Sequence, residues 1–553
     1  MGGKKSTIKN RSKLKEYIVY MNQSSKGFKR YFAIIYFSSL CFSAVSIFIA
    51  IVGQQLLDSL LTMENAVIIK VLLISICAYV MGAILGFFTS YFQKYVIDKY
   101  KMRMQISFYN NMQKSEFLFF SNLSSSDVYY RMFTDIGVMV DFYLNLLISI
   151  PVKMLVFLAA LGIMLYWSPS MSIAIVSLVV MQVLVATIFR APIRKSAEKT
   201  LKAEQSLIAN INEDVLNGDI CRSLGLEHYF ESKITPQFDN TRRAKLNNSK
   251  INLIFSSLIG LIAQVTNIFL LLLGVYFLAK DDISLGILMG ISMLSGYIYQ
   301  PLNDSVSMIL SYQQTIVSYT RFKEFNNAVD KSIYGGKLPF VDGDIVFHDL
   351  SFSYNDVPVF QLFSDVIRQG KITYFEGKNG AGKTTLMRLI ARHLHPTDGA
   401  IFIGDVNIVD FEYEQFRKNV ISLGSSPAVF DATLKENICA GESYDNDSIE
   451  TAVSDCALDN VVKRLPNGYD TKIGVYGEGL SAGEIQKIAL ARVLIRKPKI
   501  LILDEPLTHI DVQSSQDILK TLMNYNKKYN MTIIIISHDT SVKQIADEIH
   551  LLN

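Results

Sequence analysis

The chain has 553 residues, more than one hydrophobic core usually serves, so we expect two or more domains. Half of the residues are hydrophobic and 19% are charged, which argues against an ordinary soluble protein and predicts membrane spans followed by a soluble part. The net charge of +4 is too small to indicate a nucleic-acid partner. The five cysteines are scattered and none forms a CxxC pair, so neither a disulfide framework nor a zinc site is predicted.

The chain begins with a basic arm, residues 1–30, which includes Lys4, Lys5, Lys9, Arg11, Lys13 and Lys15. No small-residue cleavage site follows the first apolar stretch, so we expect no cleaved signal peptide. The arm is therefore predicted to stay in the cytoplasm.

Six apolar stretches are long enough to cross a bilayer. Each has about 20 residues or more, enough helix to span a hydrocarbon core of about 30 Å. Five carry no charged residue, and the third carries only Lys153. The predicted spans are 31–53, 71–93, 142–167, 171–189, 252–279 and 284–303, within a transmembrane domain of residues 31–325.

The connections between these spans differ in length and charge. Those at 54–70, 168–170 and 280–283 are short and acidic or neutral, whereas those near 94–141 and 190–251 are long and rich in Lys and Arg. Because positively charged loops stay in the cytoplasm, we expect both termini and the long connections there, and the short loops outside. The long connections have amphipathic helical patterns, so the membrane helices are predicted to continue into the cytosol.

Lys153 has two open interpretations. Counted back from Trp167, it lies about 21 Å from the outer interface and about 9 Å from the inner one. Its stem either snorkels to the inner interface, or its charge faces a water-lined cavity and meets substrate. Pro151 is interpreted as a tolerated kink rather than a hinge.

A phosphate-binding loop is predicted after a short linker, residues 326–344. From residue 345 onward, β-rich runs alternate with helical ones, as in a parallel-sheet nucleotide-binding domain. A GxxxxGK[ST] loop follows the strand at 372–375, so its backbone N–H groups and Lys383 are predicted to hold the phosphates of ATP and Thr384 to hold Mg²⁺. The predicted nucleotide-binding residues here are Gly377, Lys378, Asn379, Gly380, Ala381, Gly382, Lys383, Thr384 and Thr385.

A second apolar strand, 499–503, delivers an acidic pair. Asp504 is predicted to bind Mg²⁺ through water, and Glu505 to polarise the attacking water as general base. Between the two strands, Leu480-Ser481-Ala482-Gly483-Glu484 predicts a helix start, with Ser481 as N-cap and Glu484 completing a capping box.

The order of these motifs resembles the ABC ATPase family. The phosphate loop, LSAGE, Ile502-Leu503-Asp504-Glu505-Pro506 and Ile536-Ser537-His538-Asp539 follow one another as they do in that family. LSAGE is similar to the family's LSGGQ signature, with Ala482 and Glu484 as departures. Residues 119–136 and 212–227 resemble the two cytoplasmic loops of exporter-type half-transporters. The implied fold is an α-helical six-span transmembrane domain followed by an α/β P-loop ABC ATPase domain, residues 345–553.

The resemblance implies further roles and a partner. Tyr354 looks like the aromatic residue that stacks on adenine, His538 like the switch histidine at the γ-phosphate, and Asp511 like the D-loop aspartate. Ser481 and Gly483 belong to the signature, which completes the site of a second subunit. The resemblance therefore implies a dimer with a second half-transporter, either a homodimer or a heterodimer.

The sequence departs from the family pattern at several positions. Ser425 stands where a glutamine is expected in the Q-loop, and a serine is too short to reach Mg²⁺ and water. Val475 stands in the loop before the signature where GERG is usual, and His509 replaces a small D-loop residue. The rate of hydrolysis, or its coupling to transport, is predicted to be altered.

The function implied is an ATP-hydrolysing exporter in a bacterial plasma membrane, with the ATPase domain in the cytoplasm. We expect closure of two ATPase domains to reach the membrane helices through coupling helices near 124–130 and 217–224. The expected substrate is a peptide, drug-like or other amphipathic molecule. Two alternatives stay open: a lipid flippase, and an ATP-gated regulator that moves no substrate.

Overall fold

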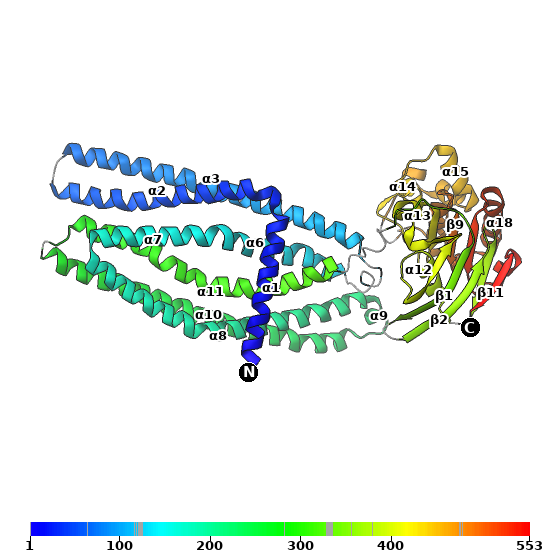
Figure 1. Cartoon of the computed structure of the whole chain (residues 1–553), viewed down its shortest axis with the longest axis horizontal. Coiled ribbons are helices and arrows are strands. Elements are labelled where there is room, and N and C mark those ends of the chain that lie inside the picture. The colour runs from blue at the N-terminus through cyan, green and yellow to red at the C-terminus, as the bar shows by residue number, and fades with distance from the viewer. Residues whose placement is uncertain are drawn as a thin grey trace. The chain divides into compact units, whose positions relative to one another are not determined.

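The computed structural model describes residues 2–62, 65–115, 117, 119, 125–280, 282–327, 336–354, 357–378, 380–474, 477 and 479–552. The chain divides into two compact units (Figure 1). One comprises Met1–Gln113 and Leu123–Asn327, and the other comprises Lys114–Asn122 and Ala328–Asn553.

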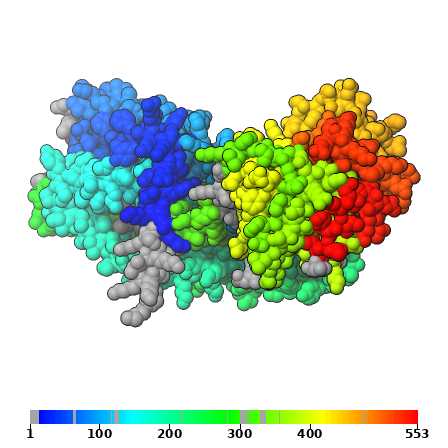
Figure 2. Space-filling model, turned by 45° about the vertical axis from the view of Figure 1, so that its right-hand side comes forward, coloured from blue at the N-terminus to red at the C-terminus, as the bar shows by residue number. Residues whose placement is uncertain are grey.

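The first unit is helical. Helix α1 crosses the other helices of this unit (Figure 1), and its second half lies in the dark blue ridge of Figure 2. Its Tyr17 is fully buried, and the Tyr17 hydroxyl donates to the Met139 carbonyl at 2.6 Å. The helices are α1 (Gly2–Ser24), η1 (Lys26–Phe28), α2 (Lys29–Thr62), α3 (Asn65–Gln113), α5 (Ser125–Tyr129), η2 (Tyr130–Asp135), α6 (Ile136–Leu144), η3 (Asn145–Ser149), α7 (Ile150–Trp167), α8 (Pro169–Leu216), α9 (Gly218–Ser223), α10 (Glu227–Leu278) and α11 (Leu285–Asn327).

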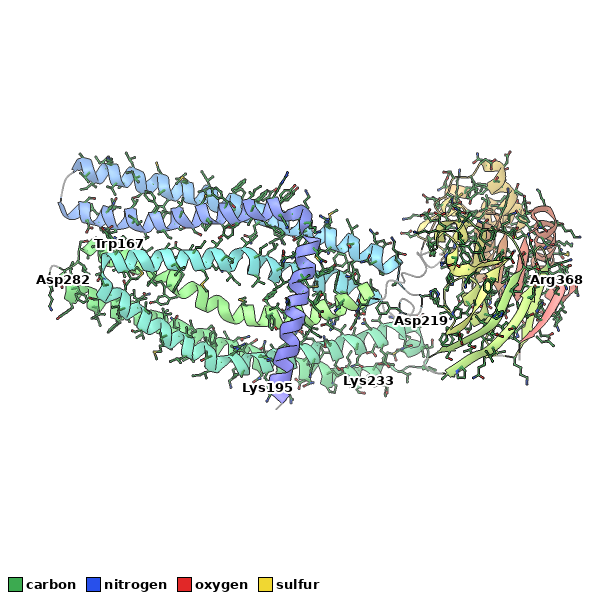
Figure 3. All side chains as sticks on the ribbon, in the orientation of Figure 1. Trp167, Lys195, Asp219, Lys233, Asp282 and Arg368 are labelled. Carbon is green, nitrogen blue, oxygen red and sulfur yellow. The ribbon has the colours of Figure 1, made fainter. Side chains whose placement is uncertain are left out.

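Five helical stretches of the described residues are long and apolar enough to cross a membrane: Lys26–Leu60, Ala66–Gln113, Asp127–Trp167, Pro169–Val215 and Glu227–Leu278. The first four contain the first four predicted spans, and the fifth contains all but the last residue of the predicted span 252–279. The sixth predicted span falls in α11, where the apolar stretch that the structure describes, Leu285–Tyr299, is shorter. Figure 3 places Trp167, at the end of α7, and Asp282, in the connection between α10 and α11, at one end of the bundle and Asp219 at the other.

The helix that holds the third span contains two π-helical turns. These turns, η2 and η3, flank α6. Pro151 lies in the first turn of α7, which begins directly after η3. The missing N–H of proline costs least there, because the backbone hydrogen bonds change at this point from the π-helical to the α-helical pattern. The half-buried Lys153 follows on the same helix.

The second unit is built on two larger sheets. One is antiparallel, in the order β2-β1-β4-β5, and the other is parallel, in the order β11-β3-β10-β9-β6. Strands β9 and β10 are buried along their whole length, as expected of central parallel strands that are covered on both faces. The strands are β1 (Ile345–Tyr354), β2 (Val357–Ile367), β3 (Ile372–Gly377), β4 (Asp398–Ile403), β5 (Val406–Asn407), β6 (Val420–Leu423), β7 (Ala432–Thr433), β8 (Lys472–Ile473), β9 (Ile500–Asp504), β10 (Thr532–Ile536) and β11 (Glu548–Leu552).

Helices surround these sheets and complete the core. They are α12 (Lys383–Ile390), α13 (Tyr413–Asn419), α14 (Leu434–Cys439), α15 (Asn446–Asp455), α16 (Asp459–Arg464), α17 (Ala482–Leu494) and α18 (Val512–Tyr529), with short 3-10 turns at Ile408–Asp410, Gly468–Asp470 and Thr540–Gln544. Because β3, β9 and β10 are parallel neighbours, the segments that follow them emerge at the same edge of the sheet.

Candidate nucleotide-binding site

The phosphate loop runs from the end of β3 to the start of α12. Gly380 and Gly382 have φ of 87° and 86°, a left-handed conformation that favours glycine. Lys383 is 9% exposed, and its ammonium donates to the carbonyls of Gly377 at 2.6 Å and Lys378 at 3.1 Å. A cation held inside a glycine loop at a helix N-terminus fits the charge and shape of a phosphate chain.

Thr384 and Asp504 lie side by side next to this loop. The Thr384 hydroxyl donates to Asp504 Oδ2 at 3.1 Å. Burial raises the pKa of Asp504, and the Thr384 hydrogen bond partly offsets this rise. The described residues include no cluster of three His, Cys, Asp or Glu side chains able to hold a metal. One hydroxyl and one carboxylate fit Mg²⁺, which takes few protein ligands and shares phosphate and water oxygens.

Glu505 and His538 meet at the same sheet edge. Glu505 follows β9 with a φ of 51°, and its carboxylate accepts the His538 backbone N–H at 3.1 Å. The His538 imidazole Nε2 lies 3.8 Å from Glu505 Oε1, and its side chain is 63% exposed. The structure thus brings together the predicted base and the predicted switch histidine, with the histidine open to a ligand.

The LSAGE segment forms the predicted capping box at the start of α17. Ser481 Oγ accepts the Glu484 N–H at 3.3 Å, and Glu484 Oε2 accepts the Ser481 N–H at 2.8 Å. Burial would raise the pKa of Glu484, but hydrogen bonds from Arg464 and Ser481 outweigh it and the pKa is lowered. Gly483 is buried against the loop after β9, and a β-carbon there would lie 2.4 Å from the His509 carbonyl oxygen.

Three other predicted site residues lie on separate elements. Tyr354 ends β1, and its hydroxyl lies 3.4 Å from that of Thr385. Asp511 caps α18 by accepting the Ser514 N–H, and this bond, with the nearby Lys487, lowers the pKa of Asp511 to about 2. Ser425 follows β6 and is exposed. Asn379, Val475 and the first residue of the 124–130 segment lie outside the described residues.

The sequence analysis missed a contact between residues 114–122 and the ATPase half. Phe117 packs at the edge of that hydrophobic core, stacked on His393 at a centroid distance of 5.2 Å. The Arg388 guanidinium lies 5.2 Å from the Phe117 ring. The predicted coupling segments contain the short helices α5 and α9, but Phe117 precedes both. An aromatic residue in the long connection that the sequence predicts to be cytoplasmic was the available signal.

Two family models match the chain. The ABC transporter transmembrane region matches residues 32–302, and the ABC transporter model matches residues 363–508. The second match contains the phosphate loop, the LSAGE segment and the Asp504-Glu505 pair.

Similar proteins extend these matches along the chain. An uncharacterized ABC transporter ATP-binding protein, YwjA of Bacillus subtilis, is 24% identical and the alignment covers 95% of this chain and 92% of that protein. The ATP-dependent permease MDL1 of Candida albicans is 29% identical over 65% of this chain and 54% of its own length. A bacterial Atm1-family ABC exporter solved with ATP bound has a TM-score of 0.84 at 20% identity, over 95% of this chain and 94% of that one.

Proposed function

This chain belongs to the ABC transporter family as an exporter-type protein with fused membrane and ATPase domains, and we propose that it is a half-transporter that works as a dimer. It is an integral membrane protein and an ATPase coupled to export. We place the basic arm at 1–30, the membrane domain at 31–325, the linker at 326–344 and the ATPase domain at 345–553.

We assign the chemistry of hydrolysis to residues at the carboxyl ends of β3, β9 and β10. Lys383 and the loop amides hold the phosphates, Glu505 accepts the proton of the attacking water, and His538 contacts the γ-phosphate. Thr384 and Asp504 would hold Mg²⁺, which would neutralise phosphate charge. The main support is the parallel register of β9 and β10, which pairs Asp504 with Ile536 and sets Glu505 beside His538.

The partner subunit completes this site in the proposed dimer. Ser481 and the N-terminus of α17 are exposed at the start of the helix, where the dipole favours an anion. They bind the γ-phosphate held by the partner's phosphate loop, and Tyr354 stacks on the adenine of its own chain. Closure of the two ATPase domains then opens the membrane helices outward, and hydrolysis resets them.

We propose a peptide or an amphipathic small molecule as the substrate, moved out of the cytoplasm across a bacterial plasma membrane. Several similar proteins are named for export, and one is named for translocation of the toxin RTX-I in Actinobacillus pleuropneumoniae. A lipid flippase predicts that lipid alone stimulates hydrolysis. A regulator predicts little hydrolysis and no movement of substrate. The departures at Ser425 and Val475 favour it, whereas the intact Glu505 argues against it.

ATP hydrolysis by the purified, lipid-reconstituted chain tests this proposal beside its Glu505→Gln variant. We expect activity in the intact chain, loss of at least about 100-fold in the variant, and unchanged ATP binding. Equal activity in both proteins would contradict the role of Glu505. No hydrolysis by the intact chain would contradict a self-sufficient homodimer and direct attention to a partner subunit.

A further inference from the structure

Tyr374 lies on β3, three residues before the phosphate loop glycine Gly377, and is 3% exposed. Its register partner on β10 is Ile535. The phenol reaches two residues further along, and its hydroxyl donates to the Ser537 carbonyl at 2.8 Å. Tyr374 therefore ties the strand that leads into the phosphate loop to the segment that carries His538.

Ser537 passes this restraint to the catalytic carboxylate. The Ser537 hydroxyl donates to Glu505 Oε2 at 3.3 Å, while the neighbouring His538 N–H donates to Glu505 Oε1 at 3.1 Å. The Asp539 N–H donates back to the Ser537 hydroxyl at 3.0 Å. Ser537 is only 4% exposed, so these groups meet with little competition from water.

Glu505 needs such support because its backbone is strained. A φ of 51° is unfavourable for a residue with a β-carbon, and its surroundings must hold it there. The Glu505 N–H donates to the Ile536 carbonyl at 2.8 Å, which fixes the backbone. The carboxylate itself is oriented by Ser537 and His538, both of which depend on the path of the chain after β10.

A second contact from β3 supports the same segment. Glu376 lies on the same face of the strand as Tyr374, and its carboxylate pairs with the Lys543 ammonium at 2.7 Å. That ammonium lies 5.9 Å from the centre of the Tyr374 ring. The chain from Ser537 to Lys543 is thus attached to β3 at both ends.

We propose that Tyr374 is a positioning residue for ATP hydrolysis, whose hydroxyl holds Ser537 so that the Glu505 carboxylate keeps its orientation beside His538. This inference rests on the roles assigned to Glu505 and His538 above. Among the described residues, Tyr374 makes no hydrogen bond to Glu505 or Lys383. Its effect on ATP hydrolysis therefore passes through Ser537.

The test is Tyr374→Phe in the full reconstituted chain, since this change removes only the hydroxyl. We expect kcat for ATP hydrolysis to fall about tenfold, because a small displacement of a catalytic group costs this much or more, while KM for ATP stays within about twofold. Tyr525→Phe is the matched control. It removes another buried hydroxyl of the same domain, which bonds Asp455 at 2.8 Å, and is expected to leave kcat unchanged.

The double variant Tyr374→Phe with Glu505→Gln separates positioning from a general loss of structure. We expect it to be no slower than Glu505→Gln alone, because Tyr374 acts through Glu505. Wild-type kcat in Tyr374→Phe would overturn the inference, as would an equal loss in Tyr525→Phe or a further loss in the double variant. A fully active Glu505→Gln variant would instead contradict the proposed general base.

Discussion

At the scale of single residues, the most constrained position of the signature segment is Gly483. The helix that begins at Ala482 passes so close to the loop after β9 that a β-carbon at Gly483 would lie 2.4 Å from the His509 carbonyl oxygen. His509 already has a φ of 65°, so its backbone has little freedom to move away. Gly483 thus sets the spacing between the signature helix and the D-loop.

Gly483→Ala is therefore expected to cost about 1–3 kcal/mol of stability by overpacking. It should also reduce ATP hydrolysis at least about tenfold, because the signature helix must shift. Thermal unfolding and steady-state hydrolysis measure the two effects. Gly162→Ala, at a helical position outside the ATPase domain where an added β-carbon would meet no atom within 4 Å, is the control and should change hydrolysis by less than about twofold. Normal ATP hydrolysis in Gly483→Ala would contradict this prediction, because it would show that the D-loop can move away without disturbing the site.

His393 makes the ATPase half sensitive to acid. Burial, together with the guanidinium groups of Arg417 and Arg388, lowers the pKa of His393 to about 4. The unfolded chain takes up this proton near pH 6.5. The contribution of His393 to the free energy of unfolding is therefore complete above about pH 6.5. It is lost as pH falls toward about 4, because the unfolded chain then binds a proton that the folded chain does not.

We expect the melting temperature of the solubilised protein to fall less between about pH 7.5 and pH 5 in His393→Phe than in the wild type, because the titrating group is gone. Phenylalanine keeps a ring for the stack on Phe117. His228→Phe, at a fully exposed histidine, should melt like the wild type at both pH values. Equal acid sensitivity in His393→Phe and the wild type would assign the effect to other groups.

At the scale of elements, the site was more predictable than the contacts between elements. A strand–loop–helix at the phosphate loop, an acidic pair after a buried strand and a capping box at Ser481 all follow from local sequence, because each depends on residues a few positions apart. The Tyr374–Ser537 hydrogen bond joins residues 163 positions apart and has no local signature. The packing of Phe117 on His393 also depends on the tertiary fold.

In the membrane helices, too, some features follow from local sequence and others do not. The first five predicted spans lie in helices that are long and apolar enough to cross a bilayer, and both properties can be read from the sequence. The π turns on both sides of α6 were not predicted, because neither Tyr130–Asp135 nor Asn145–Ser149 contains a glycine or proline to mark a break. Pro151 marks only the residues that follow the second turn.

A carboxylate clamp joins α2 to α11 at the end of the bundle that carries the short connections. Asp58 accepts hydrogen bonds from the Gly286 N–H at 3.0 Å, the Ser284 hydroxyl at 3.0 Å and the Gln54 side-chain amide at 2.9 Å. A β-carbon at Gly286 would lie 2.3 Å from the Gln54 carbonyl oxygen, so only glycine permits this approach. We expect this clamp to hold the outer ends of the two helices together and to part when the transporter opens outward.

Asp58→Asn should loosen the clamp, because the amide nitrogen cannot accept the hydrogen bonds that the second carboxylate oxygen accepts. Spin labels at the exposed positions Leu60 and Asp282 report the separation of the two ends. We expect a broader and longer distance distribution in Asp58→Asn than in the wild type. Asp98→Asn, at an exposed carboxylate paired with Lys94, is the control and should leave the distribution unchanged. An unchanged distribution in Asp58→Asn would show that packing alone closes this end.

At the scale of the whole molecule, each working ATPase site of the proposed dimer needs two chains. The phosphate loop at Lys383 and the exposed signature residue Ser481 belong to different halves of a proposed composite site. A chain that is mutated in only one of these two elements can then contribute its other, intact element to a site shared with a partner chain. This property distinguishes a shared site from one that a single chain builds alone.

The most direct measurement is ATP hydrolysis by heterodimers of a Lys383→Ala chain and a Ser481→Arg chain, isolated through two different affinity tags and reconstituted in lipid. Each variant alone is expected to be inactive. The heterodimer joins the intact phosphate loop of one chain to the intact signature of the other, so we predict that it recovers about half of the wild-type rate. An isolated heterodimer as inactive as both parents would contradict the composite site on which the account rests.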